Sequence, residues 1–211
     1  MLHRIRVAME TKSFEKMGGE GGPIEIDETF VGGKVKNMHK SKRPKKSGMQ
    51  GGAGKAIVLG MLQRGGMVRA KVIMDRTKKH VDPVVTGNVA PGSHIMTDEF
   101  SVYPHLSAEY IHEVINHVEG YVREHVHTNG IENFWSLLKR GLNGTYISVE
   151  PFHLDAYVTE QAFRFNNRAT KDNPLTDADR FALAVSQISG KRLTYAELTG
   201  KVEQTETETE A

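Results

Sequence analysis

Cysteine is absent from this chain of 211 residues, and long apolar runs are absent as well. Without cysteine there can be no disulfide, no thiolate nucleophile and no cysteine-ligated zinc site. No run approaches the roughly 20 apolar residues that a membrane-spanning helix needs. The N-terminus mixes charged with apolar residues, which is unlike a signal peptide. We therefore expect a cytoplasmic protein without membrane contact.

A large net charge is also lacking, because the formal charge is only +2, but the charges are unevenly distributed. Hydrophobic residues make up 38% and charged residues 26%, a balance typical of a globular protein. A short segment collects seven basic residues, namely Lys34, Lys36, Lys40, Lys42, Arg43, Lys45 and Lys46. Such a block suggests a polyanionic partner. A solvated loop that only aids solubility would have the same composition.

The first half of the chain predicts an antiparallel meander followed by alternating strands and helices. Residues 1–17 are predicted to form a short amphipathic helix, with Leu2, Ile5 and Met9 at helical spacing. Apolar or alternating runs predict strands at 23–33, 56–62, 68–74, 94–98 and 110–115. Helices are expected near 78–86 and 101–108. This order predicts a mixed sheet of the α/β or α+β class.

The second half is predicted to be helical. Ile131, Phe134, Trp135 and Leu138 give residues 130–140 an apolar face. A helix over 151–167 has a predicted inner face of Leu154, Tyr157, Val158, Gln161 and Phe165. Its Glu160, Arg164 and Arg168 follow each other at four-residue steps, which is typical of a salt-bridged surface. A last helix over 176–189 begins with the capping-box spacing of Thr176 and Asp179.

These elements divide the chain into four regions. Residues 1–22 form a linker helix and a flexible glycine-rich break, and residues 23–170 form a core that contains a basic loop at 34–54. Residues 171–202 contribute C-terminal helices. The tail 203–211 carries only acidic charge and is expected to be disordered.

Two aspartates occupy positions where strands normally carry apolar residues. Asp27 lies in the middle of the first strand, and Asp98 ends the apolar run of the fourth. A buried acid is costly unless it is paired or binds a metal, and strand ends in mixed sheets are common positions for sites. Either aspartate alone could be a loop cap or a turn residue. Together they indicate a shared site.

A third acid, Glu132, lies in the first turns of the helix at 130–140. Asn129, Glu132, Ser136 and Lys139 share one polar stripe of this helix. An amphipathic helix with a solvated polar face would have the same pattern. Acids that converge from distant positions nevertheless suit phosphodiester chemistry, in which two Mg²⁺ ions about 4 Å apart activate the attacking oxygen and stabilise the leaving oxygen. Mg²⁺ prefers carboxylate oxygens and retains several waters, so two or three acids suffice.

Four segments of the sequence resemble one known family. They are IEIDETFVGGK (24–34), IMTDEFSVY (95–103), HVHTNGIENFWSLLKRGLNGTY (125–146) and FRFNNR (163–168). In this order they are similar to the DDE-type transposases of bacterial insertion sequences, in the group whose N-terminal zinc ribbon precedes a ribonuclease-H-like core. The similarity covers roughly residues 1–170 and implies such a core here.

The resemblance also implies roles for individual residues. Asp27 and Asp98 match the two strand aspartates of the family. Glu132, 34 positions after Asp98, matches the third ligand and has Lys139 seven positions later, as in the family's helix. In part of the group an asparagine replaces the third acid, which makes Asn129 the alternative. These acids are expected to bind two Mg²⁺ or Mn²⁺ ions.

The implied partner is double-stranded DNA, at the transposon ends and at the target, bound by a homo-oligomer. Besides the seven basic residues of the loop, the expected DNA contacts are Lys139, Arg140, Arg164 and Arg168. The chain departs from the family because the cysteine-rich zinc ribbon is missing, which predicts a core without its own end-recognition module. Two alternatives remain open, an inactive DNA-binding remnant and a nuclease of the same fold that cuts without joining.

Overall fold

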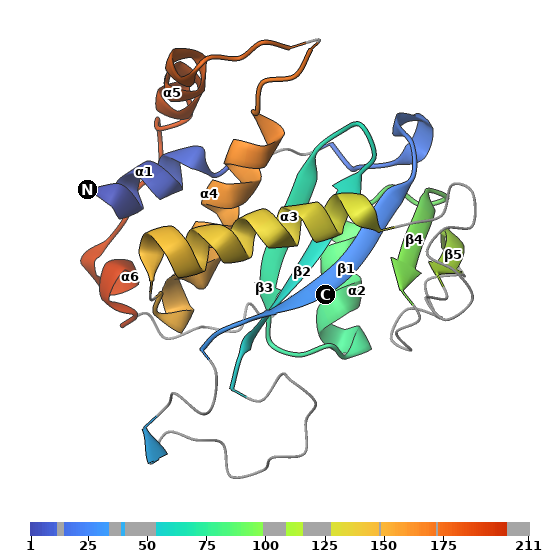
Figure 1. The fold of residues 1–211 in the computed structure, drawn as a ribbon, viewed down its shortest axis with the longest axis horizontal. Coiled ribbons are helices and arrows are strands. Elements are labelled where there is room, and N and C mark those ends of the chain that lie inside the picture. Colours follow the sequence, from blue (N-terminus) through green and yellow to red (C-terminus); the bar gives the residue numbers. More distant parts are fainter. Residues whose placement is uncertain are drawn as a thin grey trace.

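A five-stranded mixed sheet forms the centre of the computed structural model (Figure 1). The structure describes residues 1–11, 15–33, 39–40, 54–98, 109–115, 128–147, 149–171 and 173–201. The strands are β1 (Ile24–Val31), β2 (Ala56–Gln63), β3 (Val68–Ile73), β4 (His94–Asp98) and β5 (Ile111–Ile115). Their order is β3-β2-β1-β4-β5, with β1, β2 and β3 antiparallel and β4 parallel to both β1 and β5. The predicted meander is confirmed, and the arrangement is compatible with a ribonuclease-H-like core.

Both faces of the sheet are covered, and this explains the uninterrupted apolar run of β2. Val58 and Leu62 of β2 belong to the core on one face, and Leu59 and Met61 belong to the core on the other. A strand that is half-buried needs apolar residues only at every second position, whereas a strand covered on both faces needs them throughout. The strand predicted at 56–62 is confirmed, and its continuous apolar run is explained by the cover on both faces.

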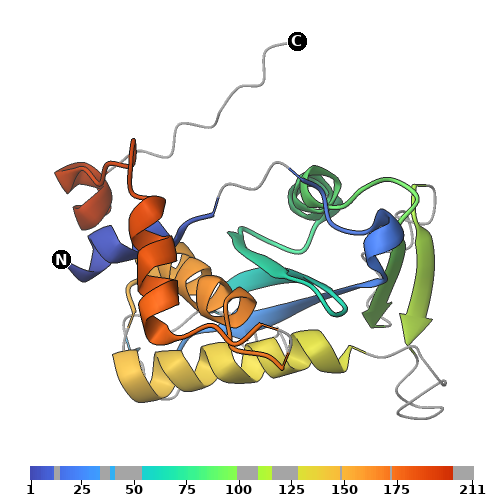
Figure 2. The same cartoon turned by 90° about the horizontal axis from the view of Figure 1, so that it is seen from above.

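Helices form a layer on each side of the sheet (Figure 2). The helix α2 (Lys78–Asn88) covers one face with Val81 and Val85. The opposite face is covered by α3 (Asn129–Arg140), which continues into a π-helix at Gly141–Tyr146, and by α4 (Leu154–Asn166), which follows a 3₁₀ turn at Pro151–His153. The predicted apolar face of α3 is confirmed, because Ile131, Phe134, Trp135 and Leu138 are all buried.

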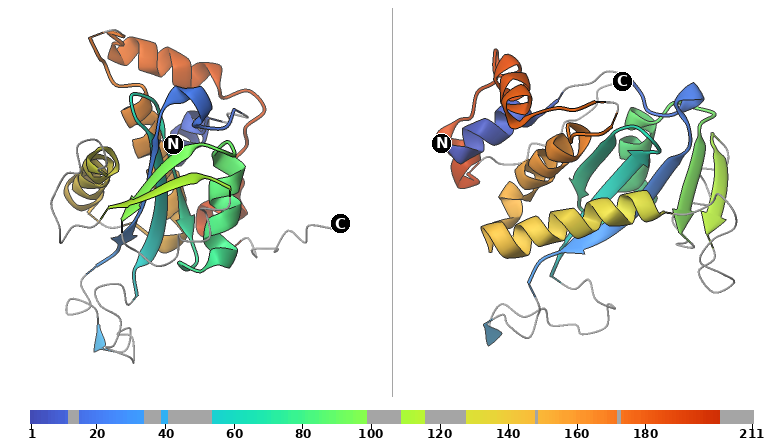
Figure 3. Two further views of the ribbon diagram at one scale, coloured as in Figure 1. Left: turned by 90° about the vertical axis from the view of Figure 1, so that its right-hand side faces the viewer. Right: turned by 45° about the horizontal axis from the view of Figure 1, so that its top comes forward.

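Three further helices lie at the end of the molecule away from β4 and β5 (Figure 3). They are α1 (Leu2–Met9), α5 (Asp177–Ser186) and α6 (Tyr195–Thr199). The capping box predicted for α5 is present, since Thr176 accepts from the Asp179 backbone and Asp179 accepts from the Thr176 backbone. The short α6 was not predicted, although its own capping box, Thr194 with Glu197, is visible in the sequence.

The expectation for the N-terminal helix was wrong in its length and in its buried face. The helix ends at Met9, and Leu2 of the predicted apolar stripe is 63% exposed. The side chain that is buried instead is Arg6, at 4% exposure, because it forms an ion pair with Glu160 of α4. Helical periodicity identified the helix, but a charged partner decided which face turns inward.

The glycine-rich segment 18–22 is held in place and is not a free break. It forms a 3₁₀ turn at Gly19–Gly21, and Gly18 has a φ of 94°, which favours glycine. The amide of Gly18 donates to Oε1 of Gln63 and the amide of Gly19 donates to Oγ of Ser93, both at 3.0 Å. These bonds fix the entry into β1.

Some expectations fall on residues outside the described part of the structure. They are the helix near 101–108, most of the basic loop and the acidic tail. Among the residues that the structure does describe, no helix is long and apolar enough to cross a membrane.

Candidate active site

Asp27 lies in β1 beneath α3, where it is partly buried. Its Oδ2 accepts a hydrogen bond of 2.8 Å from Nε1 of Trp135, and its Oδ1 accepts one of 2.8 Å from the backbone amide of Glu28. The residue opposite Asp27 in β2 is Gly60, and the Trp135 ring lies directly over this glycine. Strand β1 supplies the carboxylate, and α3 supplies the donor that orients it.

Glu25 lies two residues before Asp27 on the same side of β1, because strand side chains alternate between faces. Its Oε2 accepts from the backbone amide of Ile131, in the first turn of α3, and its Oε1 pairs with Nε of Arg64, both at 2.8 Å. The carboxylate is 1% exposed. A Cβ on Gly130 would be 2.8 Å from Oε2, so glycine allows this close approach. A negative charge at a helix N-terminus is stabilising, and Glu25 therefore fixes the start of α3.

Sequence reasoning missed Glu25. The alternation Ile24, Glu25, Ile26, Asp27 was recognised as a strand, but alternation usually means one apolar and one solvated face. Here the polar face is covered by α3. The signal that could have found Glu25 is Gly130 at the start of an amphipathic helix, since a glycine there allows another group to approach closely.

Asp98 is the last residue of β4, the strand next to β1. The parallel register pairs Ile24 with Ile95 and Glu25 with Met96. Continuing this register by two residues brings the backbone of Asp98 level with that of Asp27. The Asp98 side chain lies outside the described part of the structure. The two aspartates thus lie on neighbouring strands, and the distance between their carboxylates remains a prediction.

Glu132 is exposed in the first turns of α3, where its Oε1 is 3.3 Å from Oγ1 of Thr128. Residues of an α-helix follow each other at about 100° around the axis, which places Glu132 about 60° from Trp135. Phe134 lies on the other flank of Trp135 and packs against Phe165 of α4. Glu132 therefore lies on the flank of α3 that is turned away from α4.

The remaining residues of the polar stripe are also exposed. Asn129 is exposed and is rotated further from the sheet than Glu132, since it lies about 120° from Trp135 around the axis of α3. Lys139 lies on nearly the same flank as Glu132, about 10 Å further along the helix. Arg140 is also exposed. Glu132 and Lys139 therefore share one side of α3, and Asn129 is directed further into solvent.

Arg164 and Arg168 lie elsewhere, Arg164 on α4 and Arg168 just after its C-terminus, at the β3 end of the sheet. Arg164 donates through Nε and Nη2 to Oε1 of Glu160, at 3.1 and 2.9 Å. The guanidinium of Arg168 packs over the Phe165 ring, 3.9 Å from its centre. The structure does not bring these two arginines to Asp27, and their contact with DNA remains a prediction.

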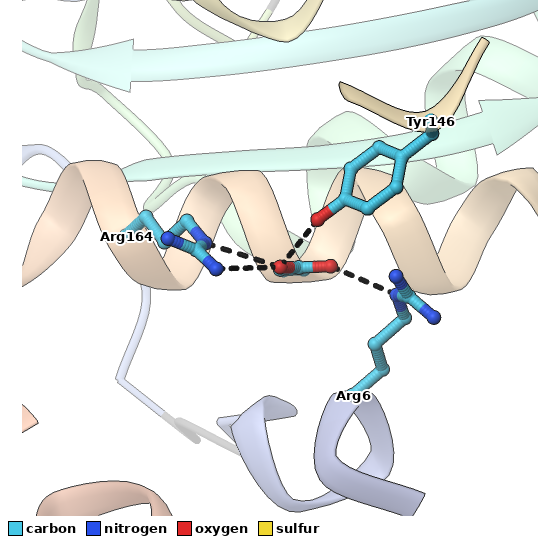
Figure 4. Close-up of polar contacts among 4 residues, drawn as sticks. Arg6, Tyr146 and Arg164 are labelled. Carbon is cyan, nitrogen blue, oxygen red and sulfur yellow. Dashed lines mark hydrogen bonds and ion pairs between the residues drawn. The ribbon is translucent and has the colours of Figure 1, made fainter. Parts of the chain in front are cut away.

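The acid of the predicted surface salt bridge of α4 is in fact buried, and Arg6, Tyr146 and Arg164 all contact it (Figure 4). Glu160 is only 6% exposed and receives hydrogen bonds from Arg6, Tyr146 and Arg164. Burial alone would raise the pKa of the Glu160 carboxyl, but these hydrogen bonds outweigh burial and hold the pKa below its ordinary value. On the predicted inner face of α4, Leu154, Val158 and Phe165 are buried as expected.

Of the basic segment, the structure describes only Lys40 among the seven predicted DNA contacts, and Lys40 is exposed. Lys34, Lys36, Lys42, Arg43, Lys45 and Lys46 lie outside the described residues. The segment connects the end of β1 to the start of β2. Since β1 and β4 are parallel, it leaves the sheet at the edge where Asp98 ends β4.

Two comparisons with known proteins agree with this arrangement. Residues 20–166, well over half of the chain, match the family model of the ISXO2-like transposase domain. The chain belongs to this transposase family. It is also 36% identical over 90 residues to an uncharacterized transposase-like protein of Haemophilus influenzae, a match that covers 42% of this chain and 72% of the relative.

The match to the transposase domain begins just before β1 and ends with α4. It therefore includes the whole sheet, Asp27, Asp98 and the polar stripe of α3, and it leaves out α1, α5 and α6. The part of the chain that carries the candidate active site is the part that the family shares.

The donor groups present fit a hard divalent cation. Asp27 offers carboxylate oxygens, held in a fixed orientation by Trp135, and Glu132 offers an exposed carboxylate on the helix that lies over β1. Carboxylates are the ligands that Mg²⁺ and Mn²⁺ prefer. Among the described side chains no three histidine or acidic groups converge. The convergence predicted here needs the carboxylate of Asp98, which is not among those side chains.

Proposed function

We propose that this chain is the catalytic core of an insertion-sequence transposase that cleaves DNA phosphodiesters and joins the freed ends to target DNA. The observation that carries the proposal is the parallel pairing of β1 with β4. Its register brings Asp98 level with Asp27, and α3 lies over β1 with Glu132 on the adjacent flank. Asp27 and Asp98 thus belong to neighbouring strands, with Glu132 on the helix over β1, in a chain of the transposase family.

In this proposal Asp27, Asp98 and Glu132 hold two Mg²⁺ or Mn²⁺ ions. Such ions activate the attacking oxygen and stabilise the leaving oxygen of a phosphodiester. Glu132 is preferred to Asn129 as the third ligand because it lies about 60° closer to the Trp135 side of the helix. Asp27 contributes a carboxylate whose plane is already set by two hydrogen bonds.

Double-stranded DNA is the proposed substrate. Lys139 shares the flank of Glu132 and would contact a phosphate next to the reacting one, while Arg140 would contact the backbone further along α3. The basic residues from Lys34 to Lys46 follow β1, the strand of Asp27, in the sequence and would contribute further phosphate contacts. Arg164 is engaged by Glu160 and therefore has a smaller expected share in DNA binding.

A plasmid assay with a labelled 3′-hydroxyl oligonucleotide tests the proposal. In the presence of Mn²⁺ the wild-type chain should nick the plasmid and join the oligonucleotide to it. Asp27→Asn and Asp98→Asn should slow both reactions by at least about a hundredfold, because each carboxylate is a proposed metal ligand. Cleavage without joining would indicate a nuclease of the same fold. DNA binding without either reaction would indicate an inactive remnant.

The third ligand is tested by a matched pair of substitutions on α3. Glu132→Gln should lose activity as Asp27→Asn does, whereas Asn129→Ala should retain most of it. The reverse result would assign the ligand to Asn129. Thermal unfolding gives a readout without DNA, since millimolar Mg²⁺ should raise the Tm of the wild type by mass action and leave that of Asp98→Asn unchanged.

A further inference from the structure

Trp135 is the only tryptophan of the chain, and it occupies a position on α3 that the proposed chemistry does not explain. The side chain is 5% exposed and belongs to the core between α3, α4 and the sheet. A buried indole N–H needs an acceptor. The acceptor here is Oδ2 of Asp27, at 2.8 Å, and not a backbone carbonyl of the same core.

Strand β2 is shaped to allow this contact. Gly60 pairs with Asp27 across the β1–β2 ladder, and a Cβ at this glycine would be 2.5 Å from Cη2 and 2.6 Å from Cζ2 of Trp135. Glycine in the interior of a strand weakens the strand unless something approaches it closely. The absence of a side chain at position 60 therefore lets the indole ring lie against β2 and reach Asp27 from above.

We propose that Trp135 is a positioning residue for Asp27, which fixes the orientation of this carboxylate for a divalent cation. The inference rests on the function proposed above and adds a residue to it. The indole N–H fixes Oδ2, and the Glu28 amide fixes Oδ1, so the plane of the carboxylate is set before a cation arrives. Groups that orient a metal ligand contribute about tenfold to a hundredfold to metal affinity.

The direct test compares Mn²⁺ affinity, by calorimetric titration, between the wild type and Trp135→Phe. Phenylalanine keeps an aromatic ring in the core but lacks the N–H donor. The proposal expects Mn²⁺ affinity to fall by about tenfold or more. The matched control is Phe134→Leu, which alters the neighbouring aromatic residue that packs on Phe165, on the other flank of α3. This control should lower Tm and leave Mn²⁺ affinity unchanged.

A second pair of variants tests the same contact from β2. Gly60→Ala places a methyl group against the indole and should displace it from Asp27, with a loss of Mn²⁺ affinity similar to that of Trp135→Phe. Gly87→Ala in α2 is the matched control, because a Cβ there meets nothing within 4 Å. It should leave Mn²⁺ affinity unchanged. This pair keeps the proposal testable if Trp135→Phe fails to fold.

The single tryptophan also reports on the site without any substitution of its own. Mn²⁺ bound by Asp27 would lie within a few ångströms of the indole and should quench its fluorescence emission. The Mn²⁺ concentration at half-maximal quenching should agree with the affinity measured by calorimetry. Asp27→Asn should abolish both the calorimetric and the fluorescence signal.

Two outcomes would contradict the role of Trp135 and leave the proposed function standing. In the first, Mn²⁺ binds through Asp27 but the tryptophan emission does not change. In the second, Trp135→Phe and Gly60→Ala both keep the wild-type Mn²⁺ affinity. If Asp27→Asn keeps wild-type Mn²⁺ binding, the metal site itself is refuted, and with it the role of Trp135.

Discussion

Two carboxylates of β1 have the same chemistry but different environments. Glu25 is almost fully buried, and its oxygens accept from Arg64 and from the first turn of α3. Asp27 lies two residues further on the same face, is partly exposed, and accepts from Trp135. Burial with two strong partners makes Glu25 a structural residue. Asp27 is less buried than Glu25, which is consistent with the proposed role of Asp27 as a metal ligand.

Replacement of Glu25 by alanine should therefore be strongly destabilising. Glu25→Ala leaves the Ile131 amide buried without its acceptor and removes the partner of Arg64, at an expected cost of about 2–4 kcal/mol in the free energy of unfolding. Urea unfolding measures this value. The matched control is Glu20→Ala, which alters an exposed glutamate and should cost less than about 0.5 kcal/mol. Equal effects of the two variants would show that Glu25 does not hold α3 on the sheet.

At the scale of elements, a buried charge cluster joins three helical segments. Arg6 of α1 and Arg164 of α4 both pair with Glu160, and Tyr146 of the π-helix after α3 donates to the same carboxylate at 2.7 Å. The Arg6 guanidinium also lies over the Tyr157 ring, 3.8 Å from its centre. The segment predicted as a linker helix is thus fixed to α4, and through Tyr146 to the end of α3.

The contribution of this cluster should depend on pH. The pKa of Glu160 is lowered in the folded protein, so its stabilisation is present above the ordinary glutamate value of 4.5 and is lost as pH falls through the lower, folded value. Glu160→Gln leaves Arg6 buried without its counter-charge and should cost about 3 kcal/mol near neutral pH. The difference from wild type should shrink progressively below about pH 4.5 in urea unfolding experiments.

Arg164→Met provides the comparison for this prediction. Arg164 is largely exposed, so the loss of its ion pair should cost no more than about 1 kcal/mol, whereas Arg6→Met removes a buried partner and should cost clearly more. A cost of Glu160→Gln that stays constant down to about pH 3 would contradict the lowered pKa.

At the scale of the whole molecule, the near-neutral net charge conceals a strongly basic segment, Lys34 to Lys46, which lies between β1 and β2 in the sequence. Each contact of a basic side chain with a DNA phosphate releases a condensed counterion, and binding then weakens as salt increases. The concentration of basic side chains in this segment makes it the first candidate for DNA binding.

Alanine at Lys42, Arg43, Lys45 and Lys46 should consequently change DNA binding far more than stability. The plot of log affinity against log salt should become flatter by about two to four units, at about 0.9 per lost contact. Tm should hardly change, because the segment contains few large apolar residues. A salt titration of DNA binding for the wild type and the quadruple variant measures the slopes. Identical slopes would move the DNA path to Lys139 and Arg140.

Local sequence patterns determined the list of elements. The strands, the meander, the buried stripe of α3 and the capping box of α5 each depend on residues close together in the chain. Spacing of two or of 3.6 residues, together with turn and cap chemistry, is sufficient to identify such elements. The same patterns located Asp27 and Asp98 on two strands and Glu132 on the helix. The family resemblance supplied their proposed roles.

Only the tertiary structure decided which polar groups are buried and with what partner. Periodicity predicted that Leu2 and Ile5 face inward and that Glu160 faces solvent, yet Arg6 and Glu160 are buried together across 154 positions of sequence. The alternation in β1 marked two faces but could not show that α3 covers the polar one, over Glu25 and Asp27. The hydrophobic pattern of a sequence shows only how apolar each position is. Whether a charged side chain is buried depends on a partner that the fold brings close from a distant part of the chain.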